Sequence, residues 1–60
     1  MSERYVIEFG GQHYGLLVLE ERHFVFHASH PAAARLDQAQ FPTVRAALHA
    51  VKQLTVVKAA

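Results

Sequence analysis

The sequence from Tyr5 to Leu19 reads YVIEFGGQHYGLLVL, and this stretch decides the fold. Its first five residues alternate between two faces, which is the period-two pattern of a strand. Gly10-Gly11 follows, and paired glycines readily adopt the positive φ values of tight hairpin turns. A second apolar run then begins at residue 14. The stretch predicts a β-hairpin, with its turn centred on Gly10-Gly11 or on Gly11-Gln12.

Both turn positions give the same division of side chains between the two faces. One face would hold Tyr5, Ile7, Phe9, Tyr14, Leu16 and Val18. The other would hold Val6, Glu8, Gly15, Leu17 and Leu19. Because this second face is partly apolar, we expect it to need cover from a loop, a helix or another chain.

Residues 23–28 alternate again after the polar break Glu20-Glu21-Arg22, which predicts a third strand. Its apolar side would be Phe24, Phe26 and Ala28, and its other side His23, Val25 and His27. Ser29 and Pro31 could cap and start one helical turn, and an irregular crossover is the alternative. Residues 37–40 look like a polar turn between Leu36 and Phe41, both anchored in the core.

The last element is an amphipathic helix that Thr43 caps. The positions that recur on one helical face are Val44, Ala47, Leu48, Val51 and Leu54. The β-branched residues 55–57 leave the end of the helix open. Residues 1–60 are therefore predicted to form one small α+β domain, a three-stranded antiparallel meander (β-β-β-α) packed on its C-terminal helix.

Composition narrows the function classes. A chain of 60 residues buries only roughly 60% of its unfolded surface, and without cysteine it must rely on packing or association. No apolar run reaches the roughly 18 residues of a membrane span, so we expect a cytoplasmic protein without a membrane partner. Four Glu and one Arg give residues 1–21 a net charge of −3. Five Lys or Arg and one Asp give residues 22–60 a charge of +4. This split in charge favours head-to-tail self-association or one basic face.

Little in the sequence indicates chemistry. Of the five histidines, His23 and His27 share a strand face but lie about 13 Å apart at the rise of a strand, too far for one metal ion. No nucleophile stands beside a base, and no pair of carboxylates is predicted to share a cleft. We predict no metal, no cofactor and no enzymatic activity.

The helix carries a basic stripe at i, i+4 and i+7, formed by Arg45, His49 and Lys52. Arg45 stands in the first helical turn, where the helix dipole favours an acid. Two interpretations follow: a salt bridge from Arg45 to Asp37 or to a glutamate of a neighbouring chain, and contact with phosphate or an acidic partner.

The chain resembles short bacterial proteins of unknown function that share a hairpin and a final helix entered through Phe-x-Ser/Thr. The residues that carry this resemblance are Tyr5 to Gly11, Gly15 to Val18, Phe41-Pro42-Thr43, Ala46-Ala47 and Ala50-Val51. The resemblance implies a bacterial cytoplasmic protein and transfers no activity. Ala46 departs from the acidic residue found early in such helices, so the capping box is incomplete.

Two functions are predicted. The first is a small interaction protein, a homodimer or a subunit of a larger partner, that uses its sheet face through Val6, Leu17, Leu19 and Val25. The alternative is a nucleic-acid-binding module that uses Arg45, His49 and Lys52.

Overall fold

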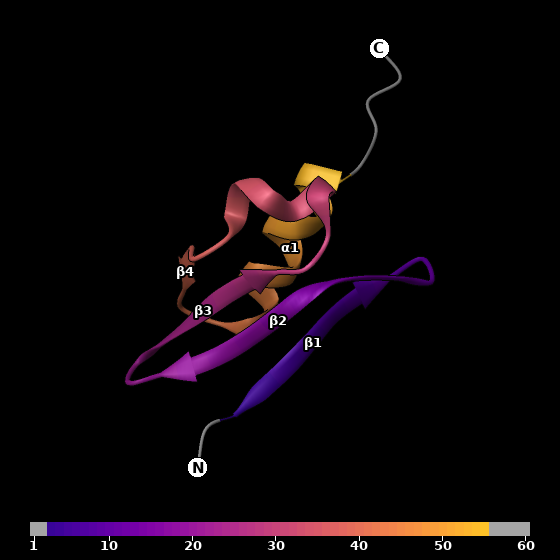
Figure 1. The fold of residues 1–60 in the computed structure, drawn as a ribbon. Helices are drawn as coiled ribbons and strands as arrows, with labels where there is room; N and C mark the ends of the chain where they lie inside the picture. Colours follow the sequence, from indigo (N-terminus) through magenta and orange to yellow (C-terminus); the bar gives the residue numbers. More distant parts are fainter. Residues whose placement is uncertain (1–2, 56–60) are drawn as a thin grey trace.

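The computed structural model describes residues 3–55 as a sheet covered on one face by a helix (Figure 1). The elements in chain order are β1 (Arg4–Phe9), β2 (Gln12–Glu20), β3 (His23–Ala28), the 3-10 helix η1 (Pro31–Leu36), β4 (Gln40–Phe41) and α1 (Val44–Thr55). The strands are antiparallel in the order β1-β2-β3-β4. The α+β class and the C-terminal helix are confirmed. Residues 56 and 57, which left the predicted end of the helix open, lie outside the described residues.

The first hairpin turns at Gly10-Gly11, one of the two predicted positions. Phe9 pairs with Gln12 across the turn, and the two glycines have φ values of 60° and 77°. Residues with a side chain rarely adopt these positive φ values, which is why glycine suits both positions.

A β-bulge in β2 changes the division of faces. Glu8 pairs with His13, but Ile7 pairs with Gly15, so Tyr14 is an extra residue between two pairs. Because the side-chain period of a strand is two, one extra residue moves the rest of β2 to the opposite face. The prediction that Leu16 and Val18 share a face with Ile7 is therefore wrong. Leu17 and Leu19 occupy that face instead.

The core forms on the face that the helix covers. Its buried residues are Ile7, Leu17, Phe26, Ala33, Ala47 and Val51. Partly buried side chains surround them, including Leu36 and Phe41, which confirms the prediction that these two are anchored in the core. Of the predicted helical face, Ala47 and Val51 are fully buried, whereas Leu48 is 36% exposed and lies at the margin.

The segment after β3 adds a fourth strand that was not predicted. Phe41 pairs with Phe24 and Gln40 with Val25. The pairing continues irregularly, because Gln38 N donates to Phe26 O and Phe26 N to Ala39 O. This segment covers the outer edge of β3, so six-residue β1 is the longer of the two edge strands.

Two caps set the ends of the helices. Thr43 Oγ1 accepts a hydrogen bond from Ala46 N at 3.0 Å, which confirms Thr43 as the cap of α1. Of the two alternatives for residues 29–35, the helical turn is observed as η1. Its cap is His30 rather than Ser29, because the His30 ring nitrogen Nδ1 accepts from Ala32 N at 2.9 Å.

Candidate interaction surface

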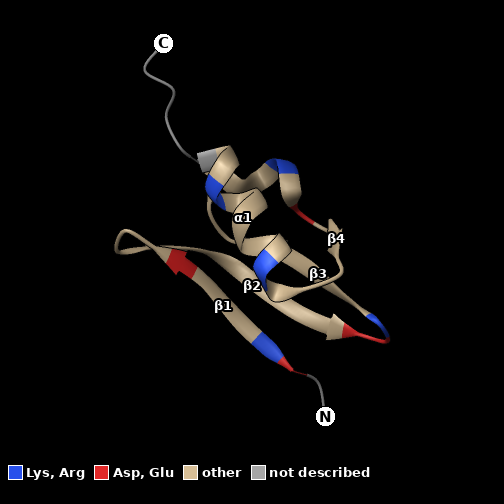
Figure 2. Ribbon diagram, turned by 180° about the vertical axis from the view of Figure 1, so that it is seen from behind, with Lys and Arg blue, Asp and Glu red and all other residues tan. Residues whose placement is uncertain are grey.

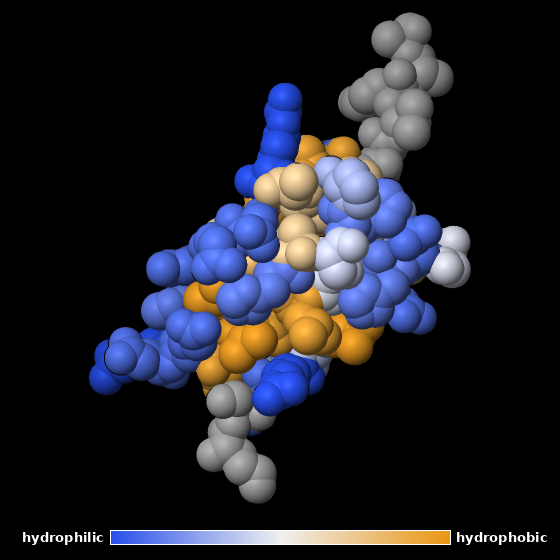
Figure 3. Space-filling view, viewed as in Figure 1, coloured by the Kyte–Doolittle hydropathy of each residue, from blue (hydrophilic) through white to orange (hydrophobic). Residues whose placement is uncertain are grey.

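The face of the sheet turned away from α1 carries an apolar strip. The figures show α1 behind the sheet in Figure 1 and in front of it in Figure 2. The pairings Val6↔Leu16 and Val18↔Val25 place four apolar side chains on the opposite face from buried Ile7 and Phe26. We call Val6, Leu16, Val18 and Val25 the outer strip. The space-filling view in Figure 3 shows hydrophobic surface between hydrophilic flanks on this side.

Exposure is concentrated at one end of the outer strip. Val25 is buried, and Leu16 and Val18 are half-buried. Val6 is 54% exposed, and its neighbour Tyr5 is 38% exposed on the inner face. Among the described residues, the exposed large hydrophobic side chains are these two and Leu48. Strand β1 thus presents apolar side chains to solvent on both of its faces.

Of the predicted sheet surface, the structure retains two residues and replaces two. Val6 and Val25 lie in the outer strip. Leu17 is fully buried in the core, and half-buried Leu19 lies on the same inner face, so the prediction is wrong for both. Leu16 and Val18 take their places. Four consecutive apolar residues, 16–19, fill both faces of β2, so hydropathy alone does not distinguish these pairs.

Polar groups flank the strip on β1. Arg4 and Glu8 lie on the same face as Val6, two residues to either side.

On the inner face, the Tyr5 hydroxyl donates a hydrogen bond to Glu3 Oε1 at 2.7 Å. This hydrogen bond and the negative charge of Glu3 raise the pKa of the Tyr5 phenol.

Three of the five histidines have defined structural contacts. His30 caps η1 and packs edge-on against Tyr14, with 5.2 Å between ring centroids. His27 Nδ1 lies 3.2 Å from Gln38 Nε2. His13 Nδ1 lies 3.0 Å from Ser29 Oγ and joins the hairpin to the segment after β3. In residues 3–55, no three side chains gather that could hold a metal ion.

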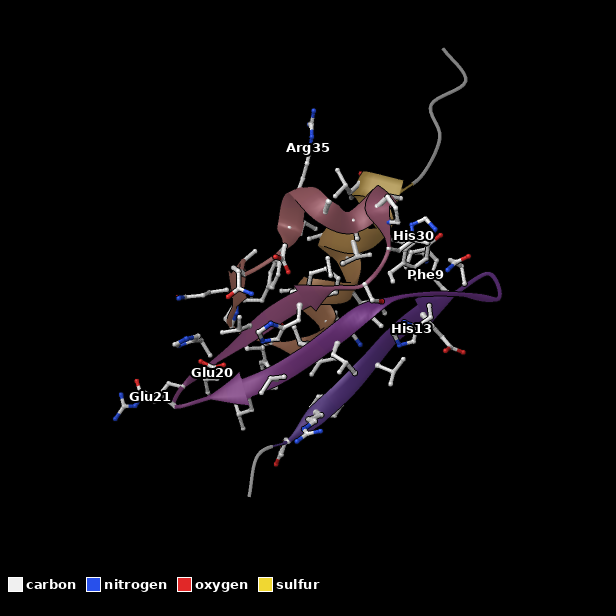
Figure 4. All side chains as sticks on the ribbon, in the orientation of Figure 1. Phe9, His13, Glu20, Glu21, His30 and Arg35 are labelled. Atoms are coloured by element: carbon white, nitrogen blue, oxygen red, sulfur yellow. The ribbon has the colours of Figure 1, made fainter. Side chains whose placement is uncertain are left out.

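The contact between His13 and Ser29 unites a hydroxyl with an imidazole, the first requirement of an activated nucleophile. A third group would have to orient the ring, and within residues 3–55 no carboxylate is hydrogen-bonded to His13. Figure 4 shows Phe9, His13 and His30 at the same end of the molecule as the turn between β1 and β2. An open hollow of about 370 Å³ nearby is lined by Ala28, Ser29, His30, Pro31, Ala34 and Asp37.

The carboxylate beside this hollow already has a structural role. Asp37 Oδ1 accepts a hydrogen bond from Ala28 N at 2.9 Å, just where β3 ends. Within the described part of the chain, Asp37 forms no ion pair with Arg45, so of the partners considered for Arg45 the salt bridge to Asp37 is not observed.

The basic stripe lies on the outside of α1. Arg45, His49 and Lys52 are all exposed, while Ala47 and Val51 face the core. Figure 2 shows basic segments along α1, and the helix has no acidic residue in its first turn. Arg45, His49 and Lys52 thus lie on the solvent-exposed side of α1.

Comparison of the chain with protein-family models, with curated proteins and with solved structures found no match. No helix within residues 3–55 is long and apolar enough to cross a membrane.

Proposed function

We propose that this chain is a small interaction protein that associates with a second copy of itself through β1, whose Val6 is the exposed end of the outer strip. The observation that carries the proposal is the position of the exposed apolar side chains, two of which lie on β1. An edge strand also presents unpaired backbone groups, so β1 combines apolar contact with hydrogen-bonding capacity.

Physical considerations favour self-association for a chain of this size. A 60-residue domain without cysteine has a small core, and pairing two copies buries more apolar surface at no cost in chain length. A two-fold interface uses the same patch on both copies, so one exposed strand is sufficient to build it.

A charge at Val6 tests this proposal. We expect Val6→Lys to convert a particle with twice the mass of one chain into a single chain, because two ammonium groups would then lie in the interface. The fold should persist, since Val6 is more than half exposed. Light scattering on a sizing column gives the mass, and far-ultraviolet circular dichroism follows the fold.

Leu48→Lys is the matched control, because Leu48 is also an exposed large aliphatic residue but lies on α1. It should leave the mass unchanged. An equal loss of association in both variants would show that general hydrophobicity, rather than β1, drives the assembly.

The alternative function is nucleic-acid binding through Arg45, His49 and Lys52, which is supported by their common exposure on a helix without acidic residues. With two phosphate contacts, the affinity for a duplex should fall about tenfold between about 50 and about 200 mM salt. Arg45→Ala should flatten this dependence. Fluorescence anisotropy with a labelled duplex measures both, and no binding at the lower salt would rule this function out.

A further inference from the structure

The hydrogen bonds between β1 and β2 determine which backbone groups of β1 face its free edge. Leu19 N donates to Glu3 O at 2.9 Å, so Glu3 and Leu19 form a hydrogen-bonded pair of the antiparallel ladder. The register then makes Tyr5 with Leu17, and Ile7 with Gly15, the next hydrogen-bonded pairs. The backbone groups of the odd-numbered residues therefore point toward β2.

The even-numbered residues of β1 consequently point their backbone N–H and C=O groups away from β2, toward the free edge of the sheet. These residues are Arg4, Val6 and Glu8. In residues 3–55 no strand lies beyond β1 to receive these groups. Their side chains all lie on the outer face of the sheet, so one row of residues offers both a backbone edge and a side-chain pattern.

That pattern is self-complementary about Val6. A second β1 strand placed antiparallel, with the two-fold axis at Val6, sets Val6 opposite Val6 of the second copy. It sets each Arg4 opposite a Glu8. Opposite charges directly across an antiparallel pair are stabilising, and like charges are destabilising.

Other symmetric registers are less favourable. An axis at Arg4 or at Glu8 puts like charges directly opposite each other. An axis at Tyr5 or at Ile7 pairs Val6 with a charged residue and leaves the other charged residue without an opposite charge. Only the axis at Val6 uses the full length from residue 4 to residue 8 and matches every charge.

We propose that two copies of this chain pair through their β1 strands with the two-fold axis at Val6, joining their sheets into one continuous eight-stranded sheet. This inference rests on the proposed self-association and specifies its geometry. The Arg4–Glu8 pairs fix the register, and Tyr5 of one copy lies across from Ile7 of the other. The outer strips of the two copies become one apolar surface.

Single cysteines test the register, because the chain has none of its own. A hydrogen-bonded antiparallel pair has Cα atoms about 5.5 Å apart, within the range of a disulfide. Val6→Cys should therefore cross-link to itself when diamide oxidises the thiols. Arg4→Cys and Glu8→Cys should not, because each lies four residues, about 13 Å, from its own copy along the paired strands.

The decisive sample is an equimolar mixture of Arg4→Cys and Glu8→Cys chains. We expect it to form the mixed disulfide at least ten times faster than either variant alone, with the products counted on a non-reducing gel. A mixture that cross-links no faster than the separate variants, in a protein with twice the mass of one chain, would overturn this register while leaving self-association intact. A wild-type mass of one chain would overturn both.

Discussion

A chain carrying Leu17→Asp is expected to lose its fold, whereas its neighbour Leu16→Asp is expected to keep it. Leu17 is fully buried on the inner face, packed with Ile7 and Phe26. Deleting a buried leucine side chain costs about 2–5 kcal/mol, and an unpaired buried carboxylate adds to this. A domain of this size has a stability of roughly 3–9 kcal/mol, so the substitution removes most or all of it.

Leu16 is only half-buried and lies in the outer strip. A carboxylate there remains in contact with water, and we expect a cost of about 1–2 kcal/mol. Thermal unfolding followed by circular dichroism distinguishes the two variants. If Leu16→Asp unfolded the chain and Leu17→Asp did not, β2 would lack the bulge and its faces would be reversed.

Gly15→Ala is expected to be the most damaging of the glycine-to-alanine substitutions. A Cβ added to Gly15 would lie 2.6 Å from Phe26 Cζ and would clash with the backbone oxygen of His27. Neither neighbour can move freely, because Phe26 is fully buried and His27 lies in β3. Overpacking of this kind costs about 1–3 kcal/mol, and the contact with backbone favours the upper end of that range.

Gly10→Ala provides the comparison. A Cβ at Gly10 meets no atom within 4 Å, so only its positive φ opposes the substitution, at a cost of about 1 kcal/mol. Urea unfolding of the two variants gives both free energies. A smaller loss for Gly15→Ala than for Gly10→Ala would show that the ring of Phe26 does not lie over Gly15.

Local signals were sufficient to predict the hairpin and the final helix. The turn needs two residues with positive φ, and Gly10-Gly11 supplies them. The start of α1 needs a side-chain acceptor for a free N–H group, and Thr43 supplies it. Such features depend on neighbours in sequence, so the residues themselves reveal them.

The faces of β2 depend on a contact distant in sequence. The bulge at Tyr14 lets this ring stack on Phe9, with 4.6 Å between centroids, and brings Gly15 beneath Phe26. Strand alternation alone cannot place an extra residue, so the predicted interaction face of the sheet included Leu17 and Leu19 in error. Strand β4 was not predicted for a similar reason. Its two residues are too few to show a strand period, and only their pairing with β3 defines them as a strand.

The free edge of β1 could likewise not be predicted as a pairing surface from the sequence. Arg4, Val6 and Glu8 can be read from the sequence as one face of a strand. The strand order of the structure shows that β1 lies at the edge of the sheet. The hydrogen bond between Leu19 and Glu3 shows that the backbone groups of these three residues point away from β2.

The most direct test of self-association through β1 is the solution mass of the unmodified chain, measured by light scattering over a dilution series. We predict twice the mass of one chain at high concentration, with dissociation to a single chain on dilution. A single-chain mass at every concentration would contradict self-association, and with it the role proposed for β1.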